Sequence, residues 1–216
     1  MSSGAVGLAL LIAAAVVYVV VARRVKAPCP PWMNWGLDNR FMSGLASEMF
    51  ELLALGRGMK ALDAGCGPGR LSVVAARAVS PTGEVTALDV QPEMIARARE
   101  NARGAGLENV RFIEGGLGEG RIGQGLYDAA FMVSVLGEIR DPEAAFRELY
   151  DALRPGGMLA ITEVILDPHY QRRSTVRRLT HDVGFAEKAC VGNWIAFTMT
   201  LEKPPTAGQP HVDLRP

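Results

Sequence analysis

Several residue types that support particular chemistries are scarce in this sequence of 216 residues. Its three cysteines, Cys29, Cys66 and Cys190, lie too far apart in the chain to form a metal-ligand pair. Such an odd and sparse set also argues against a disulfide framework and suits a reducing compartment. Basic and acidic residues number 23 each, so the net charge is zero and no strong nucleic-acid footprint is present. The length suits one domain with a substantial core and a small additional segment.

Charge is missing altogether from Gly4–Ala22, a run of 19 residues rich in Ala, Val and Leu. As a helix this run would span about 28 Å, close to the hydrocarbon thickness of a bilayer. Arg23, Arg24 and Lys26 follow at once, and the positive-inside rule places the following domain in the cytoplasm. We therefore expect a single-pass membrane anchor over residues 1–26. A cleaved signal peptide is the alternative, but it would have a basic start, a shorter apolar core and a small-residue cleavage site.

The rest of the chain is organised around a glycine-rich turn, Gly65-Cys66-Gly67-Pro68-Gly69. A short apolar stretch precedes the turn and apolar residues at helical spacing follow it, so it joins a predicted strand to a predicted helix. Glycine leaves the backbone open to a ligand there, and the free N–H groups of the helix start face what is bound. Asp89 ends a second predicted strand, 20 residues beyond Gly69, where nucleotide-binding α/β folds place an acid on the ribose. Arg70 stands where a dinucleotide site needs glycine or alanine.

This turn, with Asp63 two residues before it, resembles the one in class I S-adenosylmethionine (SAM)-dependent methyltransferases. The resemblance extends to Leu153-Arg154-Pro155-Gly156-Gly157, which is similar to the family's turn before its fifth strand, and covers roughly Gly44 to Lys203. It implies an α/β fold: a Rossmann-like, seven-stranded, mostly parallel sheet with a C-terminal antiparallel hairpin and helices on both faces. The chain is thus expected to be a bacterial-type, N-terminally membrane-anchored member.

Composition divides the chain into four segments. Residues 1–26 form the expected anchor, and residues 43–203 form the methyltransferase domain. Residues 27–42 are rich in proline and tryptophan and form a juxtamembrane linker, with Trp32 and Trp35 in an aromatic belt or in a cap over the site. Residues 204–216 contain four prolines and no apolar period, which predicts a disordered tail.

The resemblance implies SAM as cofactor, with S-adenosylhomocysteine (SAH) as product. Asp63 and the glycine turn would surround the methionine part of SAM, and Asp89 would take the ribose hydroxyls. Val90 and Leu117 would flank adenine, and Ser134 would lie near the sulfonium. Cys66 is interpreted as a space-filling residue of the turn rather than a nucleophile. The residues expected to bind the cofactor are Asp63, Gly65, Cys66, Gly67, Gly69, Asp89, Val90, Gly116, Leu117 and Ser134.

Two positions depart from the family's pattern. Gly116 stands where the family normally has an acid that accepts from the adenine amino group, and Glu119 is a candidate to reach back in its place. Gly137 stands where related sequences often have a histidine, which removes one candidate base.

The candidate catalytic residues are Glu138, His169 and Tyr170. They follow predicted strands, and their place at the carboxyl ends of those strands puts them in the crevice where open α/β sheets bind ligands. Trp35 is a further candidate on the acceptor side. A loop acid without a catalytic role remains the alternative for Glu138. The sequence shows no metal-ligand cluster and no Asn-Pro-Pro-Tyr-like motif of amide and base methylators.

These features predict a membrane-anchored methyltransferase that acts on a small, lipophilic or membrane-associated acceptor, such as a phospholipid amine or a quinone precursor. An arginine-rich stretch over residues 172–178 is either a solvated helix face or a contact with anionic lipid. Two other functions stay open: a catalytically silent SAM-binding scaffold at the membrane and a nicotinamide-dependent oxidoreductase.

Overall fold

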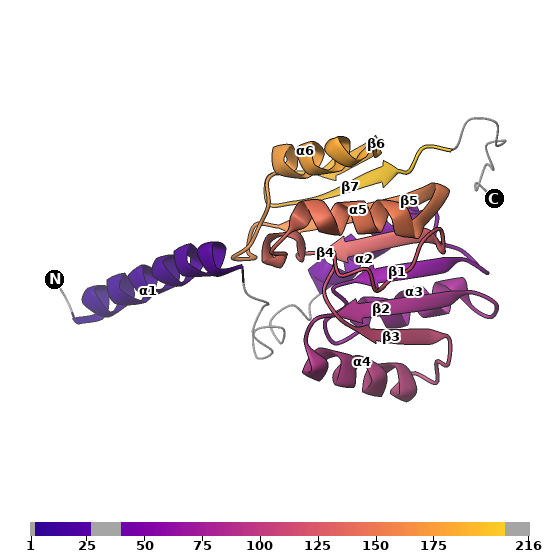
Figure 1. Cartoon of the computed structure of the whole chain (residues 1–216). Coiled ribbons are helices and arrows are strands. Elements are labelled where there is room, and N and C mark those ends of the chain that lie inside the picture. Colours follow the sequence, from indigo (N-terminus) through magenta and orange to yellow (C-terminus); the bar gives the residue numbers. More distant parts are fainter. Residues whose placement is uncertain (1–2, 27–39, 206–216) are drawn as a thin grey trace.

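The computed structural model describes residues 3–26 and 40–205. Seven strands form one sheet in the order β3-β2-β1-β4-β5-β7-β6, with helices on both faces (Figure 1). The strands are β1 (Lys60–Ala64), β2 (Glu84–Asp89), β3 (Val110–Glu114), β4 (Tyr127–Val133), β5 (Leu153–Val164), β6 (Ala186–Gly192) and β7 (Ala196–Glu202). The helices are α1 (Ser3–Val25), α2 (Arg40–Leu52), α3 (Arg70–Val79), α4 (Pro92–Gly104), the one-turn η2 (Leu136–Glu138), α5 (Pro142–Ala152) and α6 (Arg173–Val183).

The sheet is parallel from β3 to β5 and antiparallel at its C-terminal end. Strand β1 pairs with β2 and β4, β2 pairs with β3, and β4 pairs with β5, all in parallel. Strand β7 runs antiparallel to both of its neighbours, β5 and β6. The predicted Rossmann-like sheet with a closing antiparallel hairpin is therefore confirmed.

The period of two in the central strands divides the core into two layers. Ala61 of β1 packs with α2 and α3, whereas the next residue, Leu62, packs with α5 and α6 on the opposite face. Strand β4 repeats the alternation, with Phe131 on the first face and Met132 on the second. Helix α4 packs over β2 and β3 on the same face as α3, through a smaller cluster around Ala98. Because both faces are covered, the carboxyl edge of the strands is left as the open side.

Helix α2 ends at Leu52 because Ala54 adopts a positive φ of 47° that a helix cannot continue through. One boundary differs from what the sequence predicts. Strand β5 begins at Leu153, whereas the sequence predicts a turn over residues 153–157. The register between β4 and β5 shifts there, with Tyr127 opposite Leu153 and Ala129 opposite Met158. The expected turn is therefore a bulge inside β5, with Gly156 at a φ of 80°.

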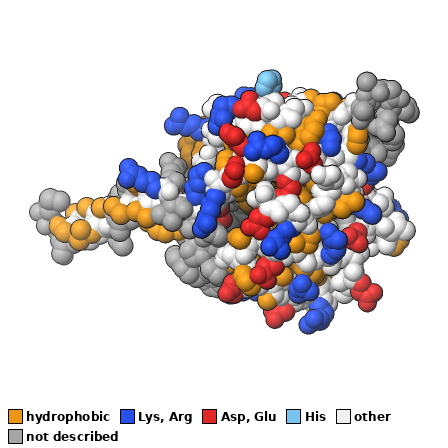
Figure 2. All heavy atoms as spheres, in the orientation of Figure 1, with side chains coloured by type: hydrophobic (Ala, Val, Ile, Leu, Met, Phe, Trp, Pro, Cys, Tyr) orange, Lys and Arg blue, Asp and Glu red, His pale blue; other side chains and the backbone are white. Residues whose placement is uncertain are grey.

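Helix α1 extends away from the sheet in Figure 1, and hydrophobic side chains cover much of it in Figure 2. Leu8 and Leu10 are 61% and 66% exposed. The expectation of a transmembrane helix is not met: in residues 3–26 and 40–205, no helix has the length and apolar character of a membrane span. The expected linker or cap, with Trp32 and Trp35, and most of the expected tail lie outside the described residues.

Candidate functional site

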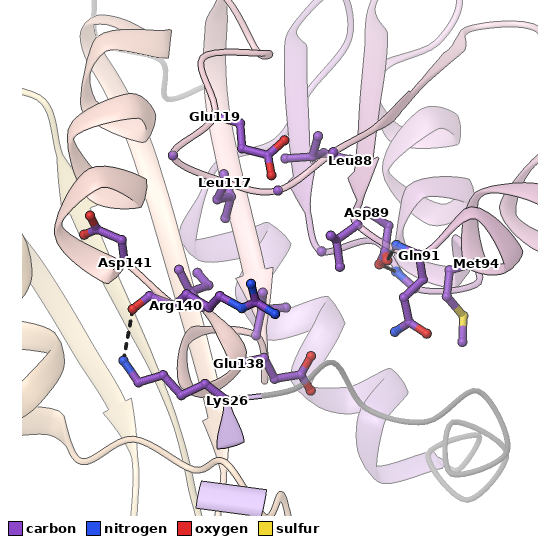
Figure 3. Close-up of a pocket in the computed structure, with 18 of the residues that line it drawn as sticks. Lys26, Leu88, Asp89, Gln91, Met94, Leu117, Glu119, Glu138, Arg140 and Asp141 are labelled. Carbon is purple, nitrogen blue, oxygen red and sulfur yellow. Dashed lines mark hydrogen bonds between the residues drawn. The ribbon is translucent and has the colours of Figure 1, made fainter. Parts of the chain in front are cut away.

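A cavity of about 510 Å³ opens at the carboxyl ends of β1, β2 and β4 (Figure 3). Asp89, Gln91 and Met94 lie at one end of it, and Lys26 and Arg140 lie at the other. Parallel α/β sheets bind ligands at this edge, beside the strand where the chain order reverses. The order of this sheet reverses between β1 and β4, and the cavity lies at that point.

The glycine turn forms the floor of the cavity, and each of its three glycines has a positive φ. A Cβ on Gly65 would lie 2.5 Å from the Val135 side chain, and a Cβ on Gly69 would lie 2.7 Å from Cβ of Ala98. These two glycines therefore allow close packing of β1 on β4 and of α3 on α4. Gly67 differs, because it lines the cavity and a Cβ there would meet nothing within 4 Å. Its backbone is open to a ligand.

Asp89 ties the turn to the loop after β2. Its Oδ2 accepts from the Gly67 backbone N–H at 2.8 Å, and its Oδ1 accepts from the Gln91 N–H at 2.9 Å. Burial raises the pKa of Asp89, while the N–H groups of Gln91 and Gly67 oppose the rise. The carboxyl group lines the cavity and can accept hydrogen bonds from hydroxyl groups of a ligand.

Asp63 and Cys66 lie behind the cavity wall. Asp63 accepts a hydrogen bond from the Ser72 hydroxyl at 2.6 Å, and burial raises its pKa to about 7. It therefore fixes the start of α3 beneath the turn. The Cys66 side chain packs against Ala98, and burial raises the pKa of its thiol, which makes the thiol a poor nucleophile.

The loop after β3 forms the roof of the cavity. Leu117 points into it (Figure 3), and the Glu119 carboxylate lies beside Gly116. A Cβ on Gly116 would lie 2.8 Å from Oε1 of Glu119, so this carboxylate fills the space that a side chain at 116 would take. The backbone N–H of Gly116 and a 3.0 Å bond from Arg121 lower the pKa of Glu119.

The loop between β5 and α6 meets the end of β4 at the other end of the cavity. Ser134 has a positive φ of 53°, and its hydroxyl donates to Asp167, which also lines the cavity. His169 is buried: its backbone N–H donates to Asp167 Oδ1 at 2.6 Å, and its Nδ1 lies 3.8 Å from Glu138 Oε1. A Cβ on Gly137 would overlap the His169 carbonyl oxygen, so glycine at 137 lets η2 approach this loop.

The structure brings most of the residues singled out in the sequence to this cavity, but not all of them. Those that line it are Gly65, Gly67, Asp89, Val90, Gly116, Leu117, Ser134 and Glu138. Tyr170 instead packs edge-on against Phe197, and its ring lies against the core cluster beneath α5 and α6. No three His, Cys, Asp or Glu side chains in the described ranges are placed to hold a metal ion.

Sequence reasoning missed Glu163, which is 1% exposed at the end of β5. Its Oε2 accepts from the Gln171 N–H at 2.8 Å, and burial raises its pKa to about 8. A lone acid in the otherwise apolar end of a predicted strand was the available signal. Lys26 was also missed as a site residue, because nothing in the sequence shows that the end of α1 reaches the cavity.

Residues 55–198 match the sequence model of a protein family that is described as "Methyltransferase domain". An arsenite methyltransferase of Halobacterium salinarum is 35% identical over 112 residues, which are 52% of this chain and 29% of that protein. A demethylmenaquinone methyltransferase of Listeria welshimeri is 33% identical over 113 residues, again 52% of this chain and 48% of that protein. The chain thus spans less than half the length of these curated relatives.

The fold is that of solved methyltransferases. A SAM-dependent methyltransferase from Aquifex aeolicus superposes with a TM-score of 0.73 at 23% identity, covering 81% of this chain and 98% of the other. The [4+2]-cyclase SpnF superposes with a TM-score of 0.69 at 19% identity, covering 76% and 82%. Because the family model matches well over half of the sequence, the chain belongs to the methyltransferase-domain family, with SAM as its cofactor and SAH as the product form.

Proposed function

We propose that the protein transfers the methyl group of SAM to a small, lipophilic acceptor. The observation that carries the proposal is one continuous cavity that runs from the glycine turn and Asp89 to Ser134, Glu138 and Arg140. The end at the glycine turn and Asp89 has an open backbone and a carboxylate, as a nucleoside ligand needs. The other end has titratable groups. Such an arrangement can hold a donor and an acceptor in one dry space.

The residues present fit the cofactor. Gly67 leaves the backbone of the turn open to the ligand, Asp89 offers its carboxyl group to the ribose, and Val90 and Leu117 flank the space for adenine. Asp63, Cys66 and Gly69 support the turn from behind. Ser134 would lie near the sulfonium, at the junction of the two parts of the cavity.

Bound SAM supplies a methyl group on a positively charged sulfur, which is the difficult part of the chemistry. The chain then has to hold the acceptor in line with that group and to exclude water, and positioning alone supplies most of the acceleration. Glu138 lines the cavity and can receive a proton from the acceptor, and the His169 Nδ1 lies behind it, 3.8 Å from Glu138 Oε1 and 3.6 Å from Asp167 Oδ1. Tyr170 does not line the cavity and packs against Phe197.

A lipophilic acceptor is proposed because α1 ends at the mouth of the cavity. Lys26 follows α1 directly, lines the cavity and donates to the Arg140 carbonyl oxygen at 3.2 Å (Figure 3). The exposed apolar side chains of α1 would contact lipid and bring the cavity to a membrane surface, on the cytoplasmic side where SAM is available. One curated relative is named for demethylmenaquinone and another for arsenite, and the apolar α1 favours an acceptor of the first kind.

The test is a calorimetric titration of the full chain with SAH, run beside NADH. We expect micromolar binding of SAH and no binding of NADH, because Arg70 follows the turn where a dinucleotide site needs glycine or alanine. Methyl transfer from labelled SAM into lipid-extractable product then tests the acceptor class, with vesicle cosedimentation of the chain as the test of lipid contact. Binding of SAH without transfer to any acceptor would favour the silent scaffold, and binding of NADH would contradict the proposal.

We also propose that Glu119 accepts from the adenine amino group in place of the missing acid at 116. Glu119→Ala should weaken SAH binding about tenfold, by about 1.4 kcal/mol, because one charged acceptor is lost. Binding of S-inosylhomocysteine, which lacks that amino group, should change little. Both affinities are measured by calorimetry.

A double variant sharpens the test of Glu119. Gly116→Asp in the Glu119→Ala background should restore the preference for SAH, since removal of Glu119 frees the space beside residue 116. Glu114→Gln, an exposed acid at the end of β3, serves as the control and should leave both affinities unchanged. Equal losses for SAH and S-inosylhomocysteine in Glu119→Ala would show that Glu119 does not contact the amino group.

A further inference from the structure

Four titratable side chains lie close together at the acceptor end of the cavity: Glu138, Glu163, Asp167 and His169, called here the carboxyl cluster. They come from η2, from the end of β5 and from the loop that follows it. Nδ1 of His169 lies 3.6 Å from Asp167 Oδ1 and 3.8 Å from Glu138 Oε1. Asp167 and Glu138 line the cavity, while Glu163 lies deeper and interacts electrostatically with both.

Glu163 is the buried end of this cluster. Its Oε2 accepts from the Gln171 N–H, but among the described residues its Oε1 has no hydrogen-bond partner although it is buried. A buried carboxylate with an unsatisfied oxygen costs free energy, and a proton on that oxygen removes the charge. The environment of Glu163 therefore favours its neutral, proton-holding form.

The charges that face the cluster agree with this assignment. Burial and, to a smaller extent, the nearby Asp167 and Glu138 carboxylates raise the pKa of Glu163 to about 8, and the N–H of Gln171 opposes the rise. Burial also raises the pKa of Asp167, opposed by the N–H and the charge of His169 and by the Ser134 hydroxyl. The cations on this side of the cavity, Lys26 and Arg140, lie at its mouth. Within the cluster, Glu163 is the group that holds a proton at neutral pH.

We propose that the carboxyl cluster releases a proton to solvent when SAM binds and then receives the proton that the acceptor loses. This inference rests on the proposed function, which places the sulfonium beside Ser134, a hydrogen-bond partner of Asp167. A positive sulfonium there favours the ionised cluster, whereas the neutral thioether of SAH favours the protonated one. The cluster is therefore a base when SAM is bound and an acid once SAH has formed.

The balance of the reaction follows from that exchange. The sulfur–methyl bond breaks, a bond forms from the methyl carbon to the acceptor atom, and the acceptor's proton passes to the cluster. One positive charge on sulfur and one negative charge on the cluster disappear together, so the summed charge of cofactor and cluster does not change. This assigns the acceptor to the classes that carry an ionisable proton, such as a phenol, an enol or a protonated amine.

The experiment compares proton release when the full chain binds SAM and when it binds SAH. Calorimetric titrations at neutral pH, in phosphate and in Tris, give the number of protons released from the dependence of the heat on buffer ionisation. We expect SAM to release about one proton more than SAH, because only SAM carries the sulfonium charge. Glu163→Gln, which keeps the shape of the side chain, should cut this difference to less than half.

Two further measurements secure the result. Asp167→Asn should reduce the difference as Glu163→Gln does, and Glu114→Gln should leave it at the wild-type value. Each variant is compared with wild type for the same ligand, so that ionisation of the ligand itself cancels. An unchanged difference in both Glu163→Gln and Asp167→Asn would overturn the inference. Failure of wild type to bind either ligand would instead contradict the proposed function.

Discussion

Asp89→Ala is expected to weaken SAH binding by roughly 1–3 kcal/mol, about 5- to 150-fold. The substitution removes the proposed acceptor for the ribose hydroxyls. It also removes the acceptor for the N–H groups of Gly67 and Gln91, at 2.8 and 2.9 Å, so the glycine turn loses its tie to the loop after β2. Calorimetric titration of the variant with SAH measures both losses together.

Glu84 provides the matched control for Asp89. It is an acid at the opposite end of the same strand, exposed and away from the cavity, so Glu84→Ala should leave SAH affinity unchanged. Asp89→Asn separates the two losses, because the amide still accepts through one oxygen. SAH affinity in Asp89→Ala that equals wild type would contradict the ribose assignment.

Gly137→Ala is expected to lower the midpoint of thermal unfolding by roughly 3–10 °C, on the scale of 1–3 kcal/mol for an overpacked site in a domain of this size. The new Cβ would overlap the His169 carbonyl oxygen and lie 2.6 Å from Cβ of His169. The overlap involves backbone, which cannot rotate away, so η2 has to move from the loop after β5. Thermal unfolding followed by circular dichroism measures the effect.

Gly104 is the control for Gly137. It ends α4, and a Cβ there would meet nothing within 4 Å. Gly104→Ala should therefore leave the midpoint unchanged or raise it, because alanine is the better helix former. Because Gly137→Ala displaces Glu138 and His169, it should also diminish the extra proton released by SAM. An unchanged midpoint in Gly137→Ala would mean that the two segments are not held together as described.

The sheet could be predicted because the pattern of apolar residues in each strand shows that the strand is buried. Strand β4, for example, is a nearly continuous apolar run that is buried on both faces. The start of β5 could not be predicted, because the glycines at 156 and 157 are equally compatible with a turn and with a bulge. Only the pairing of Leu153 with Tyr127 decides between them.

The residues of the candidate site likewise include some that the sequence predicts and some that it does not. Gly67 and Asp89 could be placed at the cavity because a local motif fixes them at the carboxyl ends of two strands. The contacts of His169 and Glu163 depend on how the loop after β5 folds back on η2, which no local pattern encodes. The membrane span was expected from the length and apolar composition of Gly4–Ala22, but no helix in the described residues has the length and apolar character of a span.

The place of β7 between β5 and β6 has a consequence for the synthesis of the chain. Strand β7 leaves the ribosome after the other described strands, yet it pairs along β5 from Val164 to Met158 and forms one side of the core through Phe197 and Met199. Until it has emerged, the nascent chain displays an unpaired apolar strand edge, which is a template for aggregation. The parallel part of the sheet is therefore complete before the chain is protected from aggregation. Termination of translation before residue 196 would leave the edge of β5 permanently unpaired.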